Sequence, residues 1–356
     1  MSEPSAERGT IDAVLREFRS VLGAELRSAP VDCRPVDRPG FSGAFVARVE
    51  TPSRAFCLRG WSLGAVGERI LALHEFLAHV RSRGVDYVAV PFAAEHGQTL
   101  VEVAWRLWQV EPWLPGSADF WSRPSDARLA AALGALARFH QASRGFEPVV
   151  HNRSQLGPAA DGIAPTVRER IERIERWSPQ RLTEVRSHLR RLPANIERRT
   201  AAAERILRVF ERAAPSIAGE LSLAAQMPVP LQPCLRDVWH DHVLFNGDEV
   251  TGLIDPSAAR TDTVAADLSR LVGSLIADDR AAWERALAAY QAVRPLSAAE
   301  SVLVSVLDRS GVLLSGMAWL ERPVFWQEQP PALAARFCER LERIAARADV
   351  LAQSIE

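Results

Sequence analysis

The spacing of apolar side chains divides the chain into a β-rich beginning and a longer helical part. In residues 11–22, apolar side chains recur every three or four positions, which predicts a helix. Helical spacing returns at residues 66–80. Short runs rich in β-branched and aromatic residues predict strands at 45–50, 54–59, 87–90, 99–103 and 106–110. The first 110 residues therefore predict a meander of strands with one inserted helix.

From residue 124 onward the pattern is mainly helical. Helices are predicted at 125–142, at 166–214 with breaks at Ser178-Pro179 and Pro193, and at 263–277, 279–293 and 331–354. Another helix opens with the capping box Ser297-x-x-Glu300. The exception is residues 233–255, where two apolar runs flank Asn246-Gly247, a strong hairpin signal. We expect one β-hairpin embedded among the helices.

Charge and composition narrow the function classes. The 43 basic and 44 acidic residues give a formal net charge of −1, which argues against a general nucleic-acid binder. No apolar run is long enough to span a membrane, and the first residues lack a signal-peptide pattern, so we expect a cytoplasmic protein without a membrane partner. The four cysteines are scattered and read as reduced thiols. The sequence contains no lysine, which excludes a lysine nucleophile or base.

The stretch from 233 to 255 carries the most informative chemistry. Asp237 stands in a predicted loop, His242 follows five residues later, and Asp255 comes at the exit of the hairpin. Because an antiparallel hairpin brings its two ends together, these three side chains can converge on one small volume. An aspartate that accepts a hydroxyl proton, placed opposite ligands for a divalent ion, suits phosphoryl transfer.

This stretch resembles the catalytic loop and metal-binding strand of the aminoglycoside phosphotransferase and choline kinase branch of the protein-kinase-like fold. The resemblance implies that Asp237 is the catalytic aspartate and Asp255 a metal ligand, with His242 in the place of the usual asparagine ligand. It also implies that Asp267, in Asp267-Leu-Ser-Arg-Leu271, braces the loop. The sequence departs from the family at Leu235-Arg236, where His-Gly is usual, and at Pro256, where an aromatic residue is usual.

The β-rich part is similar to the nucleotide-binding lobe of the same family. Gly40, Ser42 and Gly43 stand where the family has its phosphate-covering turn. Arg59 stands where a lysine or arginine contacts the phosphates, and its expected partner is an acid of the following helix, Glu68 or Glu75. Residues 108–116, with Glu111 and Trp113, resemble the hinge whose backbone binds adenine.

The resemblance as a whole implies an α+β, bilobal protein-kinase-like fold. Residues 1–113 are expected to form a nucleotide-clamping lobe, and residues 114–356 a helical lobe with the catalytic loop and acceptor-binding helices. The implied reaction is ATP-dependent phosphorylation of a hydroxyl on a small molecule, with Mg²⁺ as the metal and Mn²⁺ as an alternative. Neither the acceptor nor the oligomeric state is indicated.

Two alternatives remain open at this point. The departures around Asp237 allow a nucleotide-binding pseudokinase with weak or no activity. His240-x-His242, on an extended strand, would place both imidazoles on one face, where a third ligand such as Asp255 or Cys234 would complete the zinc site of a hydrolase. The remaining histidines, His74 among them, show no partner pattern and are interpreted as ordinary.

Overall fold

The computed structural model describes residues 3–23, 32–36, 43–149, 155–192, 197–327 and 331–355, which form two compact units. The first unit comprises residues 1–159 and 240–261, and the second comprises 160–239 and 262–356. The first unit thus adds a helix and the predicted hairpin to the β-rich part. The predicted lobe boundary at residue 113 stays a prediction.

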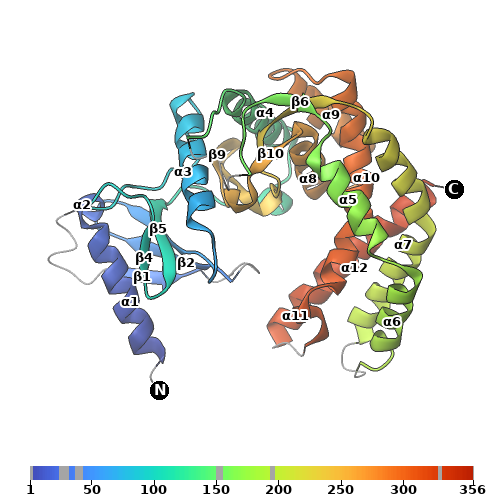
Figure 1. Ribbon diagram of the computed structural model, residues 1–356, viewed down its shortest axis with the longest axis horizontal. Coiled ribbons are helices and arrows are strands. Elements are labelled where there is room, and N and C mark those ends of the chain that lie inside the picture. Colours follow the sequence, from blue (N-terminus) through green and yellow to red (C-terminus); the bar gives the residue numbers. More distant parts are fainter. Residues whose placement is uncertain are drawn as a thin grey trace. The chain divides into compact units, whose positions relative to one another are not determined.

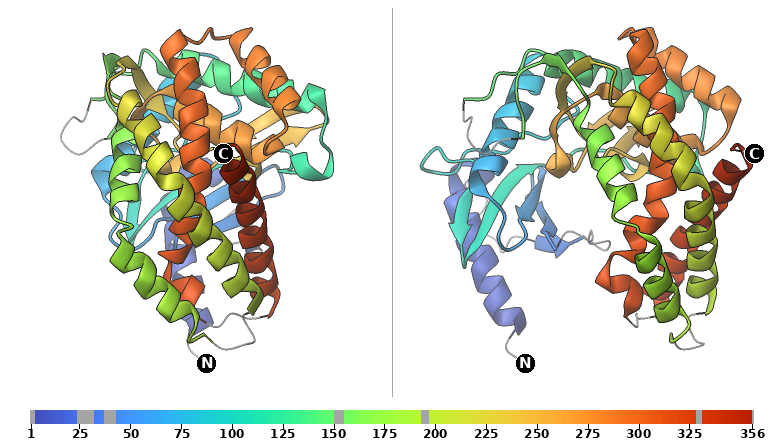
Figure 2. Two further views of the ribbon diagram at one scale, coloured as in Figure 1. Left: turned by 90° about the vertical axis from the view of Figure 1, so that its right-hand side faces the viewer. Right: turned by 45° about the vertical axis from the view of Figure 1, so that its right-hand side comes forward.

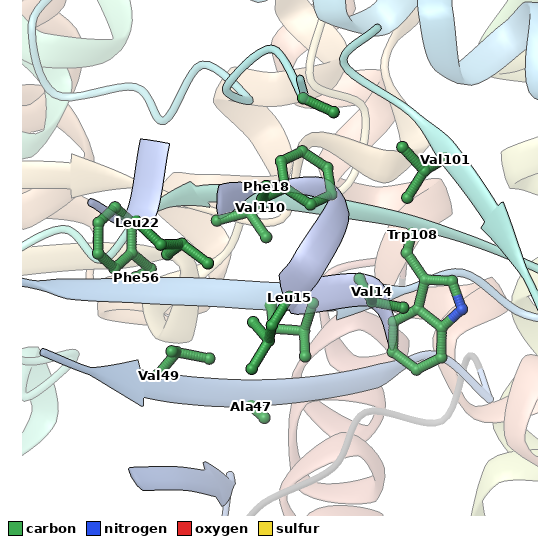
Figure 3. Packing of buried hydrophobic residues seen from close by; sticks show 12 residues of the cluster. Val14, Leu15, Phe18, Leu22, Ala47, Val49, Phe56, Val101, Trp108 and Val110 are labelled. Carbon is green, nitrogen blue, oxygen red and sulfur yellow. The ribbon is translucent and has the colours of Figure 1, made fainter. Parts of the chain in front are cut away.

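The first unit is built on a five-stranded antiparallel sheet in the order β1-β2-β3-β5-β4 (Figure 1). Its strands are β1 (Asp32–Pro35), β2 (Phe45–Glu50), β3 (Ala55–Gly60), β4 (Val101–Val103) and β5 (Arg106–Pro112). Helices α1 (Glu3–Glu17) and α2 (Arg19–Leu22) cover one face, where Val14 and Phe18 pack on Phe56, Trp108 and Val110 (Figure 3). The expected meander is confirmed at β2, β3, β4 and β5.

The strand predicted at residues 87–90 is wrong. Val88 makes only an isolated bridge to Leu253, and the backbone carbonyl of Tyr87 accepts one hydrogen bond from the amide of Leu253 at 2.8 Å. A proline at position 91 cannot donate to a further ladder bond. The apolar run is buried because it supports the hairpin, and it does not extend the sheet.

The rest of the first unit surrounds that hairpin. Its elements are α3 (Gly67–Ser82), η2 (Phe120–Ser122), α4 (Asp126–Ser143), η4 (His240–His242), β8 (Val243–Asn246), β9 (Glu249–Leu253) and η5 (Pro256–Ala258). Strands β8 and β9 pair as predicted, from Val243 opposite Leu253 to Asn246 opposite Glu249. Gly247 has φ +61°, a left-handed conformation that glycine adopts readily in such a turn. The boundary between the units falls within β10 (Arg260–Asp262).

The second unit is mainly helical. Its elements are β6 (Ala160–Gly162), α5 (Pro165–Glu175), α6 (Pro179–Leu189), α7 (Glu197–Ala224), β7 (Val229–Cys234), α8 (Val264–Ile276), α9 (Arg280–Gln291), α10 (Ala298–Leu320), α11 (Pro323–Trp326) and α12 (Pro331–Gln353). Helices α7, α10 and α12 pack together (Figure 2). The predicted capping box is present, since Ser297 and Glu300 bond each other's backbone amides. Helix α7 continues through Pro215 beyond its predicted end, and the predicted break at Pro193 lies outside the described residues.

Helix α10 is long and apolar enough to cross a membrane by length and composition. Half of its most apolar stretch is buried, and the helix packs against α7, α8 and α12. This is the environment of a core helix of the second unit.

Candidate active site

The alternation of side chains along β3 and β5 places polar residues on one face of the sheet. Successive residues of a strand point to opposite faces. Because Phe56, Leu58, Trp108 and Val110 face the core under α1, their neighbours Cys57, Arg59, Gln109 and Glu111 share the other face. The register places Cys57 opposite Glu111 and Arg59 opposite Gln109.

On that face Arg59 contacts the carboxylate of Asp255 and interacts electrostatically with Glu111. Its Nη1 donates to Oδ1 of Asp255 at 3.1 Å, and its side chain is only 12% exposed. Burial works to lower the pKa of Arg59, but the charges of Glu111 and Asp255 outweigh it and leave the pKa raised. Arg59 also lies over the ring of Trp61, 5.6 Å from its centroid. The arginine is therefore a fixed cation between two acids.

Gln109 connects Glu111 to helix α3. Its Nε2 donates to Glu111 Oε2 at 2.7 Å, while its Oε1 accepts from Trp61 Nε1 at 2.7 Å and lies 2.9 Å from His74 Nε2. Because Oε1 can only accept, His74 carries its proton on Nε2, and its Nδ1 accepts from the hydroxyl of Thr99 at 2.7 Å. These contacts form one buried chain from α3 to Glu111.

Burial sets the protonation of this chain. It lowers the pKa of His74 to about 4, against a small opposing effect of the hydrogen bond to Gln109, so the ring is neutral near pH 7. Burial also raises the pKa of Glu111, and the neighbouring Arg59, Gln109 and Cys57 partly oppose that rise. Burial raises the pKa of the Cys57 thiol, with a further contribution from Glu111, so Cys57 is an inert donor.

The hairpin brings His242 and Asp255 to the same place. The amide of Ile254 donates to the carbonyl of His242 at 3.0 Å, and His242 Nε2 lies 3.9 Å from Asp255 Oδ2. Burial opposes ionisation of Asp255, but Arg59 and His242 overcome it and lower the pKa of the carboxyl. Asp255 itself has φ +54°, a left-handed conformation that is uncommon for a residue with a side chain.

Residues 115–117, which follow β5, hold the hairpin through hydrogen bonds. Ser117 and Phe245 exchange two backbone hydrogen bonds of 3.0 and 2.9 Å, and Thr251 Oγ1 donates to the carbonyl of Pro115 at 2.6 Å. A Cβ on Gly116 would lie 2.4 Å from Thr251 Oγ1 and 2.7 Å from the Phe245 carbonyl oxygen. Gly116 also has φ +102°, so this close passage requires glycine.

His242 and Asp255 fit a divalent cation. Two atoms that ligate one Mg²⁺ or Mn²⁺ at about 2.1 Å lie at most about 4.2 Å apart, and the observed 3.9 Å satisfies that limit. Asp255, whose pKa is lowered, supplies a negative charge at this place, which favours a cation. A carboxylate oxygen suits Mg²⁺ and Mn²⁺, whereas an imidazole nitrogen suits Mn²⁺ or Zn²⁺ better than Mg²⁺.

The loop that carries Asp237 belongs to the second unit and is held by α8. Asp267 accepts hydrogen bonds from the amides of Leu235 at 2.7 Å and Arg236 at 2.6 Å. Arg236 has φ +70°, the conformation that explains a glycine in the related loops. Its side chain pairs with the buried Asp262 and, at 2.9 Å, with Glu169. These contacts brace the loop through both its backbone amides and the side chain of Arg236.

Asp237 is exposed at this loop and receives both Nε and Nη2 of Arg270 on Oδ1, at 3.2 and 2.9 Å. Arg270 lies one helical turn after Asp267 on α8, so the helix that holds the loop also orients the carboxylate.

The expected partner of Arg59 is corrected. Its acidic neighbours are Asp255 and Glu111, whereas Glu75 accepts a hydrogen bond from the amide of Val149 at 3.4 Å and Glu68 is exposed on the first turn of α3. The geometric reason is the sheet register, which places Glu111 on the same face as Arg59.

Of the other residues predicted to contact the nucleotide, the structure describes some and not others. Gly43 has φ +72°, as a turn glycine can, while Gly40 and Ser42 lie outside the described residues. Trp113 follows β5, donates its amide to the carbonyl of Ala55 at 3.3 Å and lies under Arg48. The side chain of Glu111 faces Arg59 and its backbone pairs with Cys57 of β3, so the hinge role expected for it stays a prediction.

The geometric premise of the zinc hydrolase alternative fails. His240 and His242 lie in the 3-10 helix η4, where residues two apart point in different directions, and not on an extended strand. The ring of His240 is buried and stacks on Trp121 with centroids 3.4 Å apart. The pair does not form one ligand face.

Comparison with known proteins agrees with this geometry. Residues 35–302 match the phosphotransferase enzyme family (APH). The chain belongs to this family. It is 30% identical over 249 residues to the homoserine kinase of Gluconobacter oxydans, covering 68% of this chain and 67% of that protein. Two further homoserine kinases, from Methylobacterium radiotolerans and Agrobacterium fabrum, are matched over 30% and 64% of their own lengths.

Solved structures show the same fold at low identity. A microcompartment-associated aminopropanol kinase superposes with a TM-score of 0.60 at 17% identity, covering 91% of each chain. An amicoumacin kinase in complex with AMP-PNP, Ca²⁺ and Ami superposes with a TM-score of 0.59 at 14% identity, covering 96% of each chain. The expected kinase-like α+β fold is confirmed, and family membership identifies an ATP-dependent small-molecule phosphotransferase.

Several residues of the site were missed by the sequence interpretation. Gln109, Cys57 and Arg270 were given no role, yet Gln109 and Cys57 interact with Glu111 and Arg270 contacts Asp237. His74, interpreted as an ordinary histidine, is connected to Glu111 through Gln109. Strand alternation from the apolar Phe56, Leu58, Trp108 and Val110 is the signal that identifies the two sheet residues, Cys57 and Gln109.

Proposed function

We propose that this protein transfers the γ-phosphate of ATP to a hydroxyl of a small acceptor, with the nucleotide and metal bound by the first unit and the acceptor deprotonated by Asp237. The observation that carries the proposal is the cluster that Arg59 and His242 form around Asp255. Arg59 Nη1 lies 3.1 Å from Asp255 Oδ1, and His242 Nε2 lies 3.9 Å from Asp255 Oδ2. Phosphoryl transfer requires a cation and a divalent metal ion that stabilise the charge of the phosphates, and a buried arginine beside two metal ligands can supply both.

At the nucleotide end, Arg59 steadies the phosphates. Its guanidinium can present two parallel N–H groups to a phosphate, and its positive charge persists because Glu111 and Asp255 stabilise it. Gly43 and the backbone after β5 are proposed to cover the phosphates and to contact adenine. The hydrogen-bonded chain through Gln109 fixes Glu111 and thereby the direction of Arg59.

His242 and Asp255 are proposed to hold Mg²⁺ or Mn²⁺, which when bound neutralises the charge of the β- and γ-phosphates. Asp255 remains ionised well below neutral pH because of Arg59 and His242. The imidazole in place of the family's amide ligand favours Mn²⁺.

At the acceptor end, Asp237 accepts the hydroxyl proton as the oxygen attacks. Arg270 orients the carboxylate through two N–H groups that donate to Oδ1. Asp267 positions the loop by holding two successive amides. Homoserine, the acceptor in the names of the curated relatives, is the first compound to test, and a cytoplasmic location would supply ATP.

The decisive experiment compares the wild-type protein with Asp237→Asn. Turnover is measured as ADP release with hydroxylated acceptors, and nucleotide binding as thermal stabilisation by ATP with Mg²⁺ or Mn²⁺. We expect Asp237→Asn to lower kcat by about 10²–10⁴-fold with ATP stabilisation retained. A wild-type protein that binds ATP without turnover would instead identify the pseudokinase alternative, and unchanged turnover in Asp237→Asn would refute the assigned base.

A further inference from the structure

A small cavity lies in the first unit, next to the segment that follows Asp255. It has a volume of about 250 Å³ and is bounded by residues 61–66, one face of α3, residues 155–156 and η5. All of these residues belong to the first unit. Neither Arg59 nor Asp255 lines the cavity, so it is separate from the proposed metal site. We call it the α3 cavity.

The walls of the α3 cavity are mainly apolar. Ile70 and Leu73, which lie one turn apart on α3, and Leu156 are all buried. The indole of Trp61 forms another wall, and Val66, which also lines the cavity, is 44% exposed. Small-molecule sites commonly combine such walls with a few polar groups. A benzene ring fits an apolar cavity of about 150 Å³, so the α3 cavity has room for one ring and a substituent.

Arg69 is the charged side chain on the wall. Its Nη2 donates to the carbonyl oxygen of Ser257 at 3.3 Å, and it has no carboxylate partner within the residues that the structure describes. Among the described lining residues none is an aspartate or glutamate, and Glu68, which precedes Arg69 on α3, does not line the cavity. An arginine without an acidic partner beside apolar walls favours an anion with an apolar body.

Two walls of the α3 cavity contact the proposed phosphate and metal site. The ring centroid of Trp61 lies 5.6 Å from the guanidinium carbon of Arg59. Ser257 makes a side-chain hydrogen bond to Asp255, while its backbone carbonyl accepts the hydrogen bond from Arg69. A molecule bound in the cavity therefore contacts residues that in turn contact Arg59 and Asp255.

We propose that the α3 cavity binds a small effector made of one apolar ring and one anionic group, a carboxylate or a phosphate monoester, and that the bound effector tightens the binding of nucleotide and metal. The ring lies against Ile70 and Leu73, and the anion pairs with Arg69. An occupant that contacts α3 and η5 together restricts η5 and so holds Ser257 and Asp255 in place. The coupling to nucleotide rests on the proposed function, whereas binding of the effector does not.

The first experiment measures binding in the absence of nucleotide. The probes are benzoate and benzamide, which are similar in size and shape and differ in charge, and each is titrated by isothermal calorimetry. We expect the wild-type protein to bind benzoate about tenfold more tightly than benzamide. Arg69→Gln should lower the affinity for benzoate by about tenfold and leave that for benzamide unchanged. Arg69→Lys should retain part of the preference, since the charge is kept and the fork is lost.

Two further variants separate recognition from folding. Arg83→Gln is the matched control, because Arg83 is an exposed arginine at the end of α3 that does not line the cavity, and it should leave benzoate binding unchanged. Ala65→Phe fills the cavity from the segment before α3 and should abolish the binding of both probes. Thermal unfolding identifies any variant that fails to fold, and the comparison of Arg69→Gln with Arg83→Gln does not depend on Ala65→Phe.

The second experiment measures the coupling. The affinity for ATP with Mn²⁺ is determined with and without saturating benzoate, and the affinity for benzoate with and without ATP and Mn²⁺. We expect each ligand to tighten the binding of the other by the same factor, about fivefold, because linkage between two sites is reciprocal.

The outcomes distinguish the effector site from the proposed function. Equal affinity for benzoate and benzamide, no binding of either probe, or equal losses in Arg69→Gln and Arg83→Gln would overturn the site. Benzoate that competes with ATP, or that leaves its affinity unchanged, would overturn the coupling. A protein that binds benzoate through Arg69 but neither binds nor turns over ATP would refute the proposed function and leave the site itself intact.

Discussion

Arg59 on β3 and Asp255 after β9 form a salt bridge of 3.1 Å although 196 residues separate them in sequence. The pairing ties the sheet to the hairpin within the first unit. It also holds the carboxylate beside His242, where a metal ligand is proposed. The geometry of this pair depends on Glu111, the second acid that acts on Arg59.

Replacement of Glu111 with glutamine tests that dependence. The change removes a buried charge next to Arg59 while keeping the shape of the side chain, so we expect a loss of about 1–3 kcal/mol in unfolding free energy. Arg59 should then move toward Asp255 alone, with KM for ATP about fivefold higher. Urea denaturation and steady-state kinetics measure the two effects.

Glu75→Gln is the matched control, because Glu75 was one of the two partners expected from the sequence. Its carboxylate accepts one long hydrogen bond from Val149 N, so unfolding free energy should change by less than about 0.5 kcal/mol. A larger effect on ATP binding from Glu75→Gln than from Glu111→Gln would restore the original pairing.

His74 predicts a pH dependence of stability. Its pKa is about 4 in the folded protein and near 6.5 when unfolded, so between these values the unfolded chain binds a proton that the folded protein does not. The contribution of His74 is complete above pH 6.5 and is lost as the pH falls toward 4. It amounts to about 3 kcal/mol over that range.

The measurement is the difference between the wild-type protein and His74→Gln, because carboxylates titrate in both. The unfolding free energies of the wild-type protein and His74→Gln should differ less at pH 4.5 than at pH 7. Parallel curves at all pH values would show that His74 is protonated in the folded protein at the same pH as in the unfolded chain.

Local sequence signals predicted much of the framework. The Asn246-Gly247 turn, the capping box at Ser297 and the helical repeat of α3 each depend on residues close in sequence, and each is present. The run at 87–90 was misassigned because its apolar side chains support the hairpin through one bridge at Val88, and a single sequence does not reveal that partner.

The acid that faces Arg59 was harder to predict from the sequence. Four strands of the sheet could be placed from the sequence, but the identity of the facing acid depends on the β3–β5 register, which sets Cys57 opposite Glu111. Asp267 was expected to brace the Asp237 loop, but the contribution of the Arg236 side chain was missed for a similar reason. Arg236 takes the place of a glycine only because Asp262 and Glu169, both distant along the chain, hold its side chain.

Arg236→Gly separates backbone strain from charge pairing. Glycine relieves a left-handed backbone by about 1 kcal/mol, but loss of the guanidinium removes the charged partner of the buried Asp262, to which the amides of Thr166 and Thr263 also donate. Breaking such a buried pair costs about 3–5 kcal/mol, so we expect a net destabilisation of about 2–4 kcal/mol. Urea denaturation of Arg236→Gly and of Arg236→Gly with Asp262→Asn decides the case, because the second change should recover a large part of the loss. A single variant as stable as wild type would mean that strain and pairing cancel.

Metal preference tests the imidazole at position 242. His242 lies 3.9 Å from Asp255 and offers nitrogen where an oxygen ligand is usual in the family. Because an amide oxygen suits Mg²⁺ and an imidazole suits Mn²⁺, His242→Asn should lower the ratio of kcat/KM with Mn²⁺ to that with Mg²⁺ by about tenfold. His240→Asn is the control, since that ring is buried against Trp121, and it should leave the ratio unchanged even if it reduces stability. An unchanged ratio in His242→Asn would mean that the metal is held by other groups, and the cluster around Arg59 would then have to act on the phosphates without it.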